Sequence, residues 1–328
     1  MSTGRRLGVV LFQLGGPDSF EAIEPFLYNL FSDPDIIDFP FARLARRPLA
    51  RLAARHRAAK VRKHYAEVGG KSPIIELTRA QARALERELR TVVDARVFTA
   101  MRYWHPLTEE VVREVQGGGF DELVLLPLYP QYSRTTSGSS LNEWGRQSAR
   151  AGLEVPTKVI RDFYRQPLYI EAVVERIDSA LERFPAGVPV TLVFSAHGIP
   201  QDVVEAGDPY QEQVEATAAL VLECGGWAHP YRLCYQSKVG PGRWLQPMLL
   251  ATLRELAARG ERNVLVIPIA FVTDHVETLH EIDIKARAEA AELGIRQFEL
   301  MPALNDSPRF IQALAELVRK TAEVEVPG

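Results

Sequence analysis

The sequence predicts an α/β protein made of two similar lobes, each a four-stranded parallel sheet flanked by helices. Short runs rich in β-branched residues alternate along the chain with longer amphipathic segments, which is typical of parallel α/β folding. Most of the short runs are apolar throughout, as expected for strands that helices cover on both faces. The 328 residues suit two domains of ordinary size.

The predicted strands form two groups of four. In chain order they cover 7–14, 96–103, 121–129, 157–163, 188–197, 231–237, 263–272 and 297–303. Amphipathic periodicity predicts helices over 78–90, 168–183, 214–224, 244–259, 278–293 and 308–322. Glycine or proline marks most of the junctions. We expect the lobes to divide near residues 151–157, as 1–153 and 154–328, with a cleft between them.

Composition excludes several classes of protein. A net charge of −3 argues against a dedicated nucleic-acid binder, which is usually strongly basic. No run reaches the ~20 apolar residues of a membrane-spanning helix. The run Leu7–Leu14 is too short for a secretory signal, so we expect a first strand there and a cytoplasmic protein. Two cysteines, Cys224 and Cys234, can build neither a disulfide framework nor a four-thiolate cluster.

One basic segment differs in character from the rest of the chain. Between Arg43 and Lys63 there are nine Lys or Arg residues and no acidic one, interleaved with leucines. The simplest interpretation is a solvated helix with a narrow apolar stripe. The alternative is one lip of a cleft that meets an anionic ligand or an anionic membrane surface.

His197 is the first candidate for chemistry. Ligands of parallel α/β folds bind beyond the carboxyl ends of the strands, and His197 closes an apolar run just before Gly198 and Pro200. A single histidine is more often structural than catalytic. This position favours function, because a neutral imidazole can accept a proton near neutral pH or ligate a divalent metal.

A second candidate site follows the run that ends at Val272. It combines carboxylates and imidazoles: Asp274, His275, Glu277, His280, Glu281 and Asp283. On a helix Glu277 and Glu281 share a face with His280 beside them, and stacked acids repel each other without a counter-charge. In the structural interpretation, Asp274 caps the helix and the helix dipole stabilises the acids of its first turn. A bound cation is the other, and these ligands suit iron, zinc, cobalt or nickel.

Both candidate sites resemble the signature regions of one family, the ferrochelatases: FSAHGIP at 194–200 and HVETLHEID at 275–283. Further motifs follow in family order: LGGP at 14–17, GGKSPI at 69–74, MRYWHP at 101–106, LPLYPQYS at 126–133, TSGSSL at 136–141, DPY at 208–210 and QSKVGPGRWL at 236–245. The resemblance spans about residues 7–318 and is closest to bacterial members of the protoporphyrin type. It implies the chelatase fold, two Rossmann-like lobes with a porphyrin cleft between them.

The resemblance also implies roles for individual residues. His197 and Glu277 would face each other across the cleft, as the catalytic pair and as ligands of the incoming metal. Glu281 and His280 would form a secondary acidic path. The porphyrin contacts would be Leu14, Arg102, Tyr103, Tyr210 and Trp244. Residues 39–74, which include the basic segment, would form the lip of the pocket.

The implied activity is insertion of Fe²⁺ into protoporphyrin IX to give protohaem with release of two protons, the terminal step of haem biosynthesis. Fe²⁺ is then a substrate and no cofactor is required; two cysteines cannot hold the [2Fe–2S] cluster of some members. Lys285 stands where an acid is common in some members, which interrupts any longer row of carboxylates. Leu14 and an apolar part of the lip favour protoporphyrin IX over coproporphyrin III; that part comprises Phe39, Phe41 and Leu44.

Two other functions stay open at this point. One is metal insertion into another tetrapyrrole, of coproporphyrin or sirohydrochlorin type, although sirohydrochlorin chelatases are generally shorter and lack the YPQYS and QSKVGP segments. The other is a carrier that binds haem or metal without turnover. The oligomeric state is monomer or homodimer, and peripheral contact with the inner membrane is a further expectation.

Overall fold

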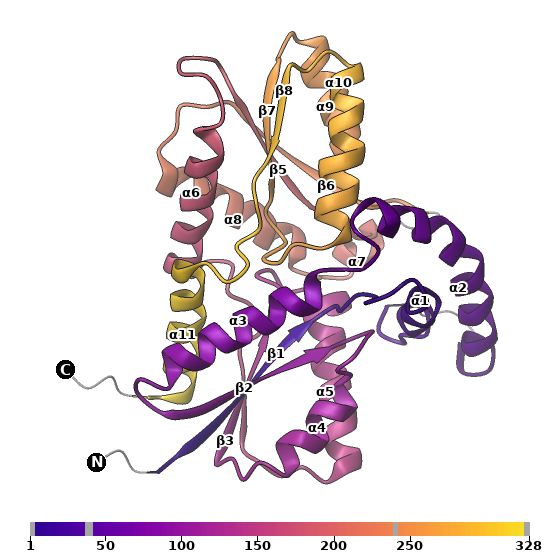
Figure 1. The fold of residues 1–328 in the computed structure, drawn as a ribbon, viewed down its shortest axis with the longest axis vertical. Coiled ribbons are helices and arrows are strands. Elements are labelled where there is room, and N and C mark those ends of the chain that lie inside the picture. Colours follow the sequence, from indigo (N-terminus) through magenta and orange to yellow (C-terminus); the bar gives the residue numbers. More distant parts are fainter. Residues whose placement is uncertain (1–3, 37–41, 239–241, 325–328) are drawn as a thin grey trace. The chain divides into compact units, whose positions relative to one another are not determined.

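The computed structural model describes residues 4–36, 42–238 and 242–324, without the side chains of residues 42–44. The predicted lip residues Phe39 and Phe41, and the side chain of Leu44, therefore lie outside the described part. The chain packs into two compact units, one running to Phe163 and resuming at Asn305, the other spanning Tyr164–Leu304. Each unit contains one four-stranded parallel sheet (Figure 1). This confirms the predicted fold class.

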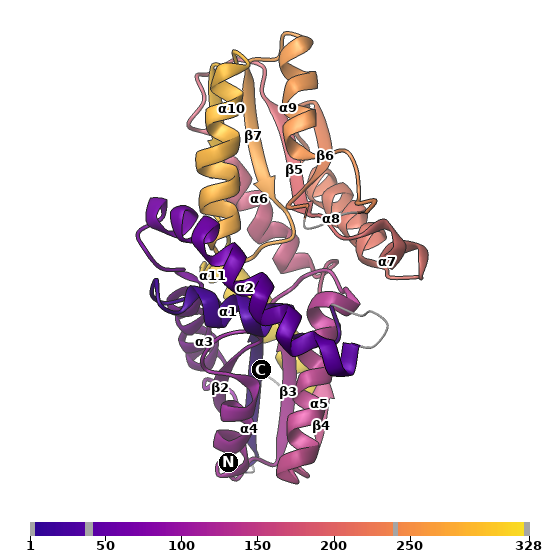
Figure 2. The same ribbon diagram turned by 90° about the vertical axis from the view of Figure 1, so that its right-hand side faces the viewer.

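The first unit is built on a sheet with the strand order β2-β1-β3-β4. Its strands are β1 (Arg6–Gln13), β2 (Asp94–Met101), β3 (Glu122–Pro127) and β4 (Thr157–Val159). Helices α3 and α11 lie on one face of this sheet, and α4 and α5 lie on the other (Figure 2). Because both faces are covered, β1 and β3 bury nearly every residue.

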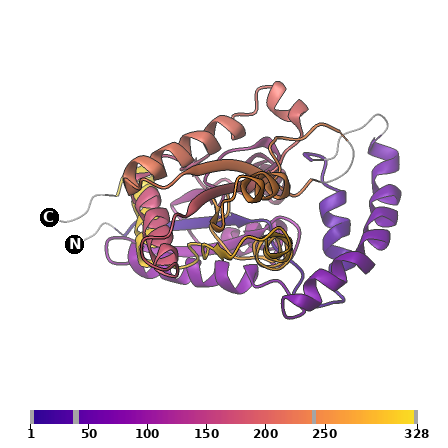
Figure 3. The same cartoon turned by 90° about the horizontal axis from the view of Figure 1, so that it is seen from above.

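Helices of the first unit include a pair that lies apart from the sheet. The full set is α1 (Ile23–Phe31), α2 (Ala42–Glu67), α3 (Ile74–Leu89), α4 (Thr108–Gln116), the short π-helix η1 (Arg134–Gly138), α5 (Ser139–Ala151) and α11 (Pro308–Ala322). Helix α1 packs along α2, away from the strands (Figure 3). Helix α2 is the predicted basic helix, with Leu49 and Leu52 exposed. Within the described residues no helix is long and apolar enough to cross a membrane.

The second unit repeats this plan, with the strand order β6-β5-β7-β8. Its strands are β5 (Thr191–His197), β6 (Tyr231–Gln236), β7 (Asn263–Pro268) and β8 (Gln297–Leu300). Its helices are α6 (Pro167–Leu181), α7 (Gln201–Glu205), α8 (Tyr210–Gly225), α9 (Leu249–Ala258), the π-helix η2 (Glu277–Ala286) and α10 (Arg287–Glu292). One core cluster joins β5 and β7 to η2 through Val193, Val266 and Ile282.

The division between the units differs from the predicted one after residue 153. Strand β4 pairs with β3, so residues 157–159 complete the first sheet and the chain enters the second unit at Tyr164. Helix α11, expected in the second lobe, packs against α3 and β3 of the first unit. Its amphipathic face buries Phe310, Leu314 and Val318 there.

All of the predicted strands are present, but several helices differ from their predicted bounds. Helices α3 and α8 begin earlier than predicted, at Ile74 and Tyr210. The helix expected from Trp244 begins at Leu249, because the chain before it is extended: Trp244 forms a β-bridge with Pro200. Helices α1, α4, α5 and α7 were not predicted. The helix over 308–322 is confirmed.

Candidate active site

His197 is the last residue of β5, at the carboxyl end of the sheet in the second unit. The chain turns directly after it, where the N–H of Gly198 donates to the carbonyl oxygen of Gln236 at 2.7 Å. A Cβ on Gly198 would lie 2.9 Å from that oxygen, so the turn requires glycine. The imidazole is thereby held at the edge of the sheet, with 30% of the side chain exposed.

Most of the acidic cluster of the sequence, from Glu277 to Asp283, lies on η2, a π-helix that begins at Glu277. Helices of this type are rare and occur frequently at functional sites. Asp274 does not cap η2 in the predicted way, because the helix starts three residues later. Its Oδ1 instead accepts a hydrogen bond from the hydroxyl of Thr278 at 3.1 Å.

The two predicted catalytic residues were expected to face each other across the cleft, but they are in direct contact. His197 Nδ1 lies 2.9 Å from Glu277 Oε2, and the two side chains are 30% and 20% exposed. Both residues belong to the second unit, so one sheet and the helix beside it supply the pair. Because Nδ1 is engaged by the carboxylate, Nε2 is the ring nitrogen that can meet a ligand.

The pKa values of both groups are shifted by this contact. Burial disfavours the imidazolium, but the charge and hydrogen bond of Glu277 outweigh burial and raise the pKa of His197 above its ordinary value. Burial also opposes ionisation of Glu277, yet the charge and hydrogen bond of His197 lower the pKa of this carboxyl. The pair therefore combines an ionised carboxylate with an imidazole that is more basic than usual.

Glu281 joins this pair through Ser237, the residue after β6. Ser237 Oγ lies 2.5 Å from Glu281 Oε2 and 3.3 Å from Glu277 Oε2. Burial and the charge of Glu277 raise the pKa of Glu281. His280, the other member of the predicted acidic path, is buried on the same helix. His197, Glu277, Ser237 and Glu281 thus form a continuous hydrogen-bonded row.

Aromatic side chains surround the turn after His197. Tyr210 is buried at the start of α8, and its hydroxyl donates to the backbone oxygen of His197 at 2.9 Å. Trp244 packs against the turn: its Cε3 lies 3.6 Å from the position that a Cβ on Gly198 would occupy. The rings of Phe271 and His197 meet edge to face, 6.2 Å between centroids. The Tyr210 hydroxyl therefore supports the backbone of His197.

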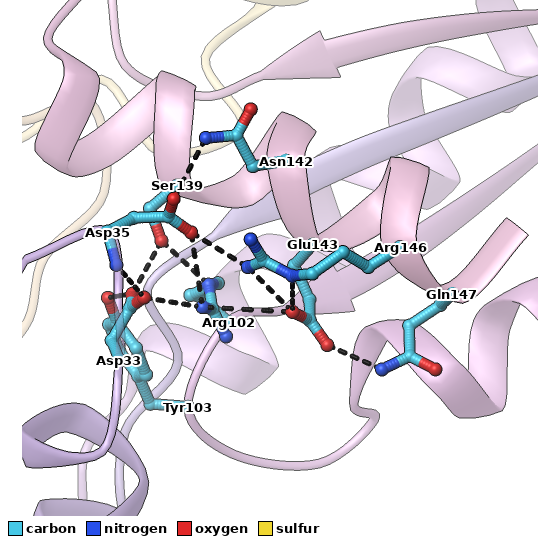
Figure 4. Close-up of polar contacts among 9 residues, drawn as sticks. All are labelled: Asp33, Asp35, Arg102, Tyr103, Ser139, Asn142, Glu143, Arg146 and Gln147. Carbon is cyan, nitrogen blue, oxygen red and sulfur yellow. Dashed lines mark hydrogen bonds and ion pairs between the residues drawn. The ribbon is translucent and has the colours of Figure 1, made fainter. Parts of the chain in front are cut away.

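The remaining predicted porphyrin contacts lie together in the first unit. The N–H of Tyr103 donates to the carbonyl oxygen of Leu14 at 3.1 Å. The side chain of Leu14 packs, partly buried, against an apolar cluster that contains Ile74 and Met101. Arg102 and Tyr103 directly follow β2, and both side chains turn toward Asp33 (Figure 4).

Asp33 is the centre of a buried polar network. Its side chain is 0% exposed, and its Oδ1 lies 2.8 Å from Arg102 Nη2. Its Oδ2 accepts hydrogen bonds from the hydroxyls of Tyr103 and Ser139, both at 2.5 Å. Arg102 Nε also donates to Ser139 Oγ at 2.7 Å. The guanidinium of Arg102 is therefore engaged within the unit, and its predicted contact with porphyrin stays a prediction.

Further ion pairs extend the network outward. Arg146 lies 2.7 Å from Asp35 and 2.8 Å from Glu143, and these two acids lie 4.0 Å and 3.9 Å from Arg102. Glu143 and Arg146 project from α5, whereas Asp33 and Asp35 belong to the segment after α1 (Figure 4). The network thus fixes that segment to the end of β2 and to α5.

Asp33→Ala is expected to reduce the free energy of unfolding by about 3–5 kcal/mol, because it leaves the Arg102 guanidinium buried without its main partner. Urea unfolding of the purified variant measures this. The control is Glu114→Ala, which breaks the exposed ion pair with Arg96 and should cost below about 1 kcal/mol. Equal effects of the two substitutions would contradict the central position of Asp33.

Comparison with known proteins identifies the family. A sequence model described as Ferrochelatase matches residues 6–322. The chain belongs to the ferrochelatase family. A ferrochelatase of Geotalea daltonii is 47% identical over 96% of this chain and 97% of its own length. Ferrochelatases of Nostoc punctiforme and of a Synechocystis species are each 46% identical over 95% of this chain, and over 81% and 82% of their own lengths.

Two solved structures share the fold of this chain. The sirohydrochlorin chelatase SirB of Bacillus subtilis subspecies spizizenii, in complex with cobalt, has a TM-score of 0.55 at 11% identity, over 97% of this chain and 96% of its own. CbiX, the terminal enzyme for siroheme biosynthesis in denitrifying bacteria, has a TM-score of 0.51 at 16% identity, over 96% and 99%. These likenesses concern the fold alone.

Sequence reasoning missed three residues that contact predicted site residues, two in the second unit and one in the first. Ser237 carries the row from Glu277 to Glu281, Phe271 packs on His197, and Asp33 holds Arg102 and Tyr103. Ser237 could have been identified from the sequence, because it is the last residue of the strand predicted over 231–237 and lies in the segment QSKVGP. No comparable signal marks Asp33, since its partners lie 70 and 106 positions further along the chain.

Proposed function

We propose that this protein inserts Fe²⁺ into protoporphyrin IX to give protohaem, with release of two protons. The observation that carries the proposal is the hydrogen-bonded pair of His197 and Glu277 at the carboxyl end of β5, 2.9 Å apart, in a chain of the ferrochelatase family. A base and a carboxylate at one point are what metal insertion needs, because two pyrrole protons leave as a divalent cation enters.

His197 and Glu277 have different roles in this reaction. His197 Nε2 accepts a pyrrole proton, and the Glu277 carboxylate on Nδ1 stabilises the imidazolium that forms. Imidazole and carboxylate are also suitable ligands for the incoming Fe²⁺. Glu281, joined through Ser237, supplies a second carboxylate along which protons leave or metal approaches. A flat porphyrin hides its nitrogen lone pairs, so binding energy elsewhere on the macrocycle must bend it.

Turnover distinguishes this proposal from a carrier that binds haem or metal. We would follow the fluorescence of protoporphyrin IX, in at least tenfold excess over protein, after anaerobic addition of Fe²⁺. An enzyme consumes all of the porphyrin, whereas a carrier stops near one equivalent. Cobalt with sirohydrochlorin, run in parallel, tests the other chelatase function. Loss of one equivalent or less with Fe²⁺ would refute the proposal.

Protoporphyrin IX is expected to give a higher kcat/KM than coproporphyrin III. The partly buried Leu14, beside Ile74 and Met101, offers an apolar wall to the vinyl-bearing edge, where each buried CH₂ contributes ~0.8 kcal/mol. Four propionates would place at least two carboxylates against apolar surface, which is costly without partners. The exposed Arg55 and Arg57 of α2 are candidates to bind two propionates.

Steady-state kinetics with both porphyrins and Fe²⁺ decide the preference. Leu14→Tyr places a hydroxyl at the apolar wall. It should bring the ratio of the two kcat/KM values, protoporphyrin IX over coproporphyrin III, closer to one. Val159→Tyr on β4, an exposed position outside the lip, serves as the control and should leave the ratio unchanged. A wild-type preference for coproporphyrin III would contradict the assignment.

The partners and setting proposed for the enzyme follow from its surface and its cysteines. Leu49 and Leu52 of helix α2 are 51% and 68% exposed and lie among basic side chains. This surface suits peripheral contact with an anionic inner membrane from the cytoplasmic side.

Monomer and homodimer both fit the proposal. With two cysteines in the sequence, Cys224 and Cys234, we propose that no [2Fe–2S] cluster is held and that no resident cofactor is needed.

A further inference from the structure

Ser237 has an unusual backbone conformation at a critical place. Its φ is +65°, in the left-handed region, and the other positive-φ residues apart from glycine in the described ranges are Asn305 and Glu323. Serine is less suited to this region than glycine or asparagine, and such conformations often accompany function. Ser237 directly follows β6, whose last residue, Gln236, lies opposite His197 in the sheet.

The conformation directs the Ser237 hydroxyl at two carboxylates of η2. Its oxygen lies 2.5 Å from Glu281 Oε2 and 3.3 Å from Glu277 Oε2. The Glu277 oxygen is the same one that contacts His197 Nδ1. One hydroxyl therefore lies between the oxygen that orients the imidazole and the next acid along the helix.

Two carboxylates on one helix face repel each other, so a donor between them has a physical purpose. A hydrogen bond to a charged group is among the stronger polar contacts, and it also fixes the direction of the carboxylate. We infer that Ser237 is a positioning residue, which holds Glu277 in line with His197 and couples it to Glu281. This inference rests on the proposed function and adds a residue to it.

The structural alternative is that Ser237 merely forms a turn. The two interpretations predict opposite results for Ser237→Gly. Glycine suits φ of +65° better than serine does, so a turn residue would be improved by the change. A positioning residue would lose its function, because the hydroxyl is gone. Stability and activity then change in different directions.

The experiment measures kcat, KM for protoporphyrin IX and Tm for Ser237→Gly and Ser237→Ala. We expect kcat to fall roughly 10- to 100-fold in both variants, the size of a lost hydrogen bond to a charged group, with KM within about twofold. The Tm of Ser237→Gly should equal or exceed that of Ser237→Ala. The matched control is Glu323→Gly, another positive-φ position, at the end of α11, which should keep full kcat.

A double-mutant cycle with Glu281→Gln tests the coupling itself. If Ser237 acts through Glu281, the double variant should be little worse than the poorer single variant. Additive losses, or kcat within about twofold of wild type in both Ser237 variants, would overturn the inference. These outcomes are distinct from failure of the proposed function, in which wild-type protein itself shows no turnover with Fe²⁺.

Discussion

His197→Ala should lower kcat for Fe²⁺ insertion by about 10²–10⁴-fold, the usual contribution of a general base. The imidazole contacts Glu277 through Nδ1, which leaves Nε2 to accept the porphyrin proton. The backbone of His197 is held independently of its side chain, by Gln236 of β6 and by the Tyr210 hydroxyl. The variant should therefore fold, and it should bind protoporphyrin IX with little change in affinity.

The control for this substitution is His105→Ala in the first unit. His105 Nδ1 also lies 2.9 Å from a glutamate oxygen, in Glu110, but these side chains are 56% and 45% exposed. The His105→Ala substitution should therefore change kcat by no more than about twofold. Porphyrin affinity is measured by fluorescence quenching, and kcat by loss of free-base porphyrin. A His197→Ala enzyme with more than about a tenth of wild-type kcat would exclude general-base catalysis by this residue.

The sequence was sufficient for the sheets because the strands carry a strong signal. The central strands β1, β3, β5 and β7 bury almost every residue, and such uninterrupted apolar runs are visible without a structure. The return of α11 to the first unit was not visible. Its periodicity predicts an amphipathic helix, but the face against which a helix packs is a tertiary property.

Some residues of the site could likewise be predicted from local sequence, but their contacts depend on tertiary structure. His197 and Glu277 were predicted because one closes a strand and the other follows one, and because the surrounding motifs resemble the ferrochelatases. The contact between them depends on the register that sets β5 beside β7 and on the π-helical start of η2. The role of Ser237 depends on a positive φ, and that of Asp33 on partners far along the chain; neither is encoded in local sequence.

Glu277→Gln keeps the size of the side chain and removes its charge, and we expect kcat to fall roughly 10²-fold with porphyrin affinity nearly unchanged. An amide cannot stabilise the imidazolium at Nδ1 as a carboxylate does, and it is a poorer ligand for Fe²⁺. Asp283→Asn is the matched control, since that carboxylate binds Arg287 further along the helix. Unchanged kcat in Glu277→Gln would mean that the acid only begins the helix.

The pH dependence of Glu277→Gln tests the reason for this loss. Proton acceptance needs neutral His197, so the kcat of the wild-type enzyme should rise with pH through the pKa of His197. Burial alone would lower that pKa, and the charge and hydrogen bond of Glu277 raise it above the ordinary value of 6.5. Without the carboxylate, burial dominates, so the acidic limb of the kcat profile should move to lower pH while its plateau falls. Profiles from pH 5 to 9, with Asp283→Asn alongside, measure both effects. A plateau that falls while the acidic limb stays in place would mean that His197 does not titrate on that limb, and would assign the proton acceptor to another group.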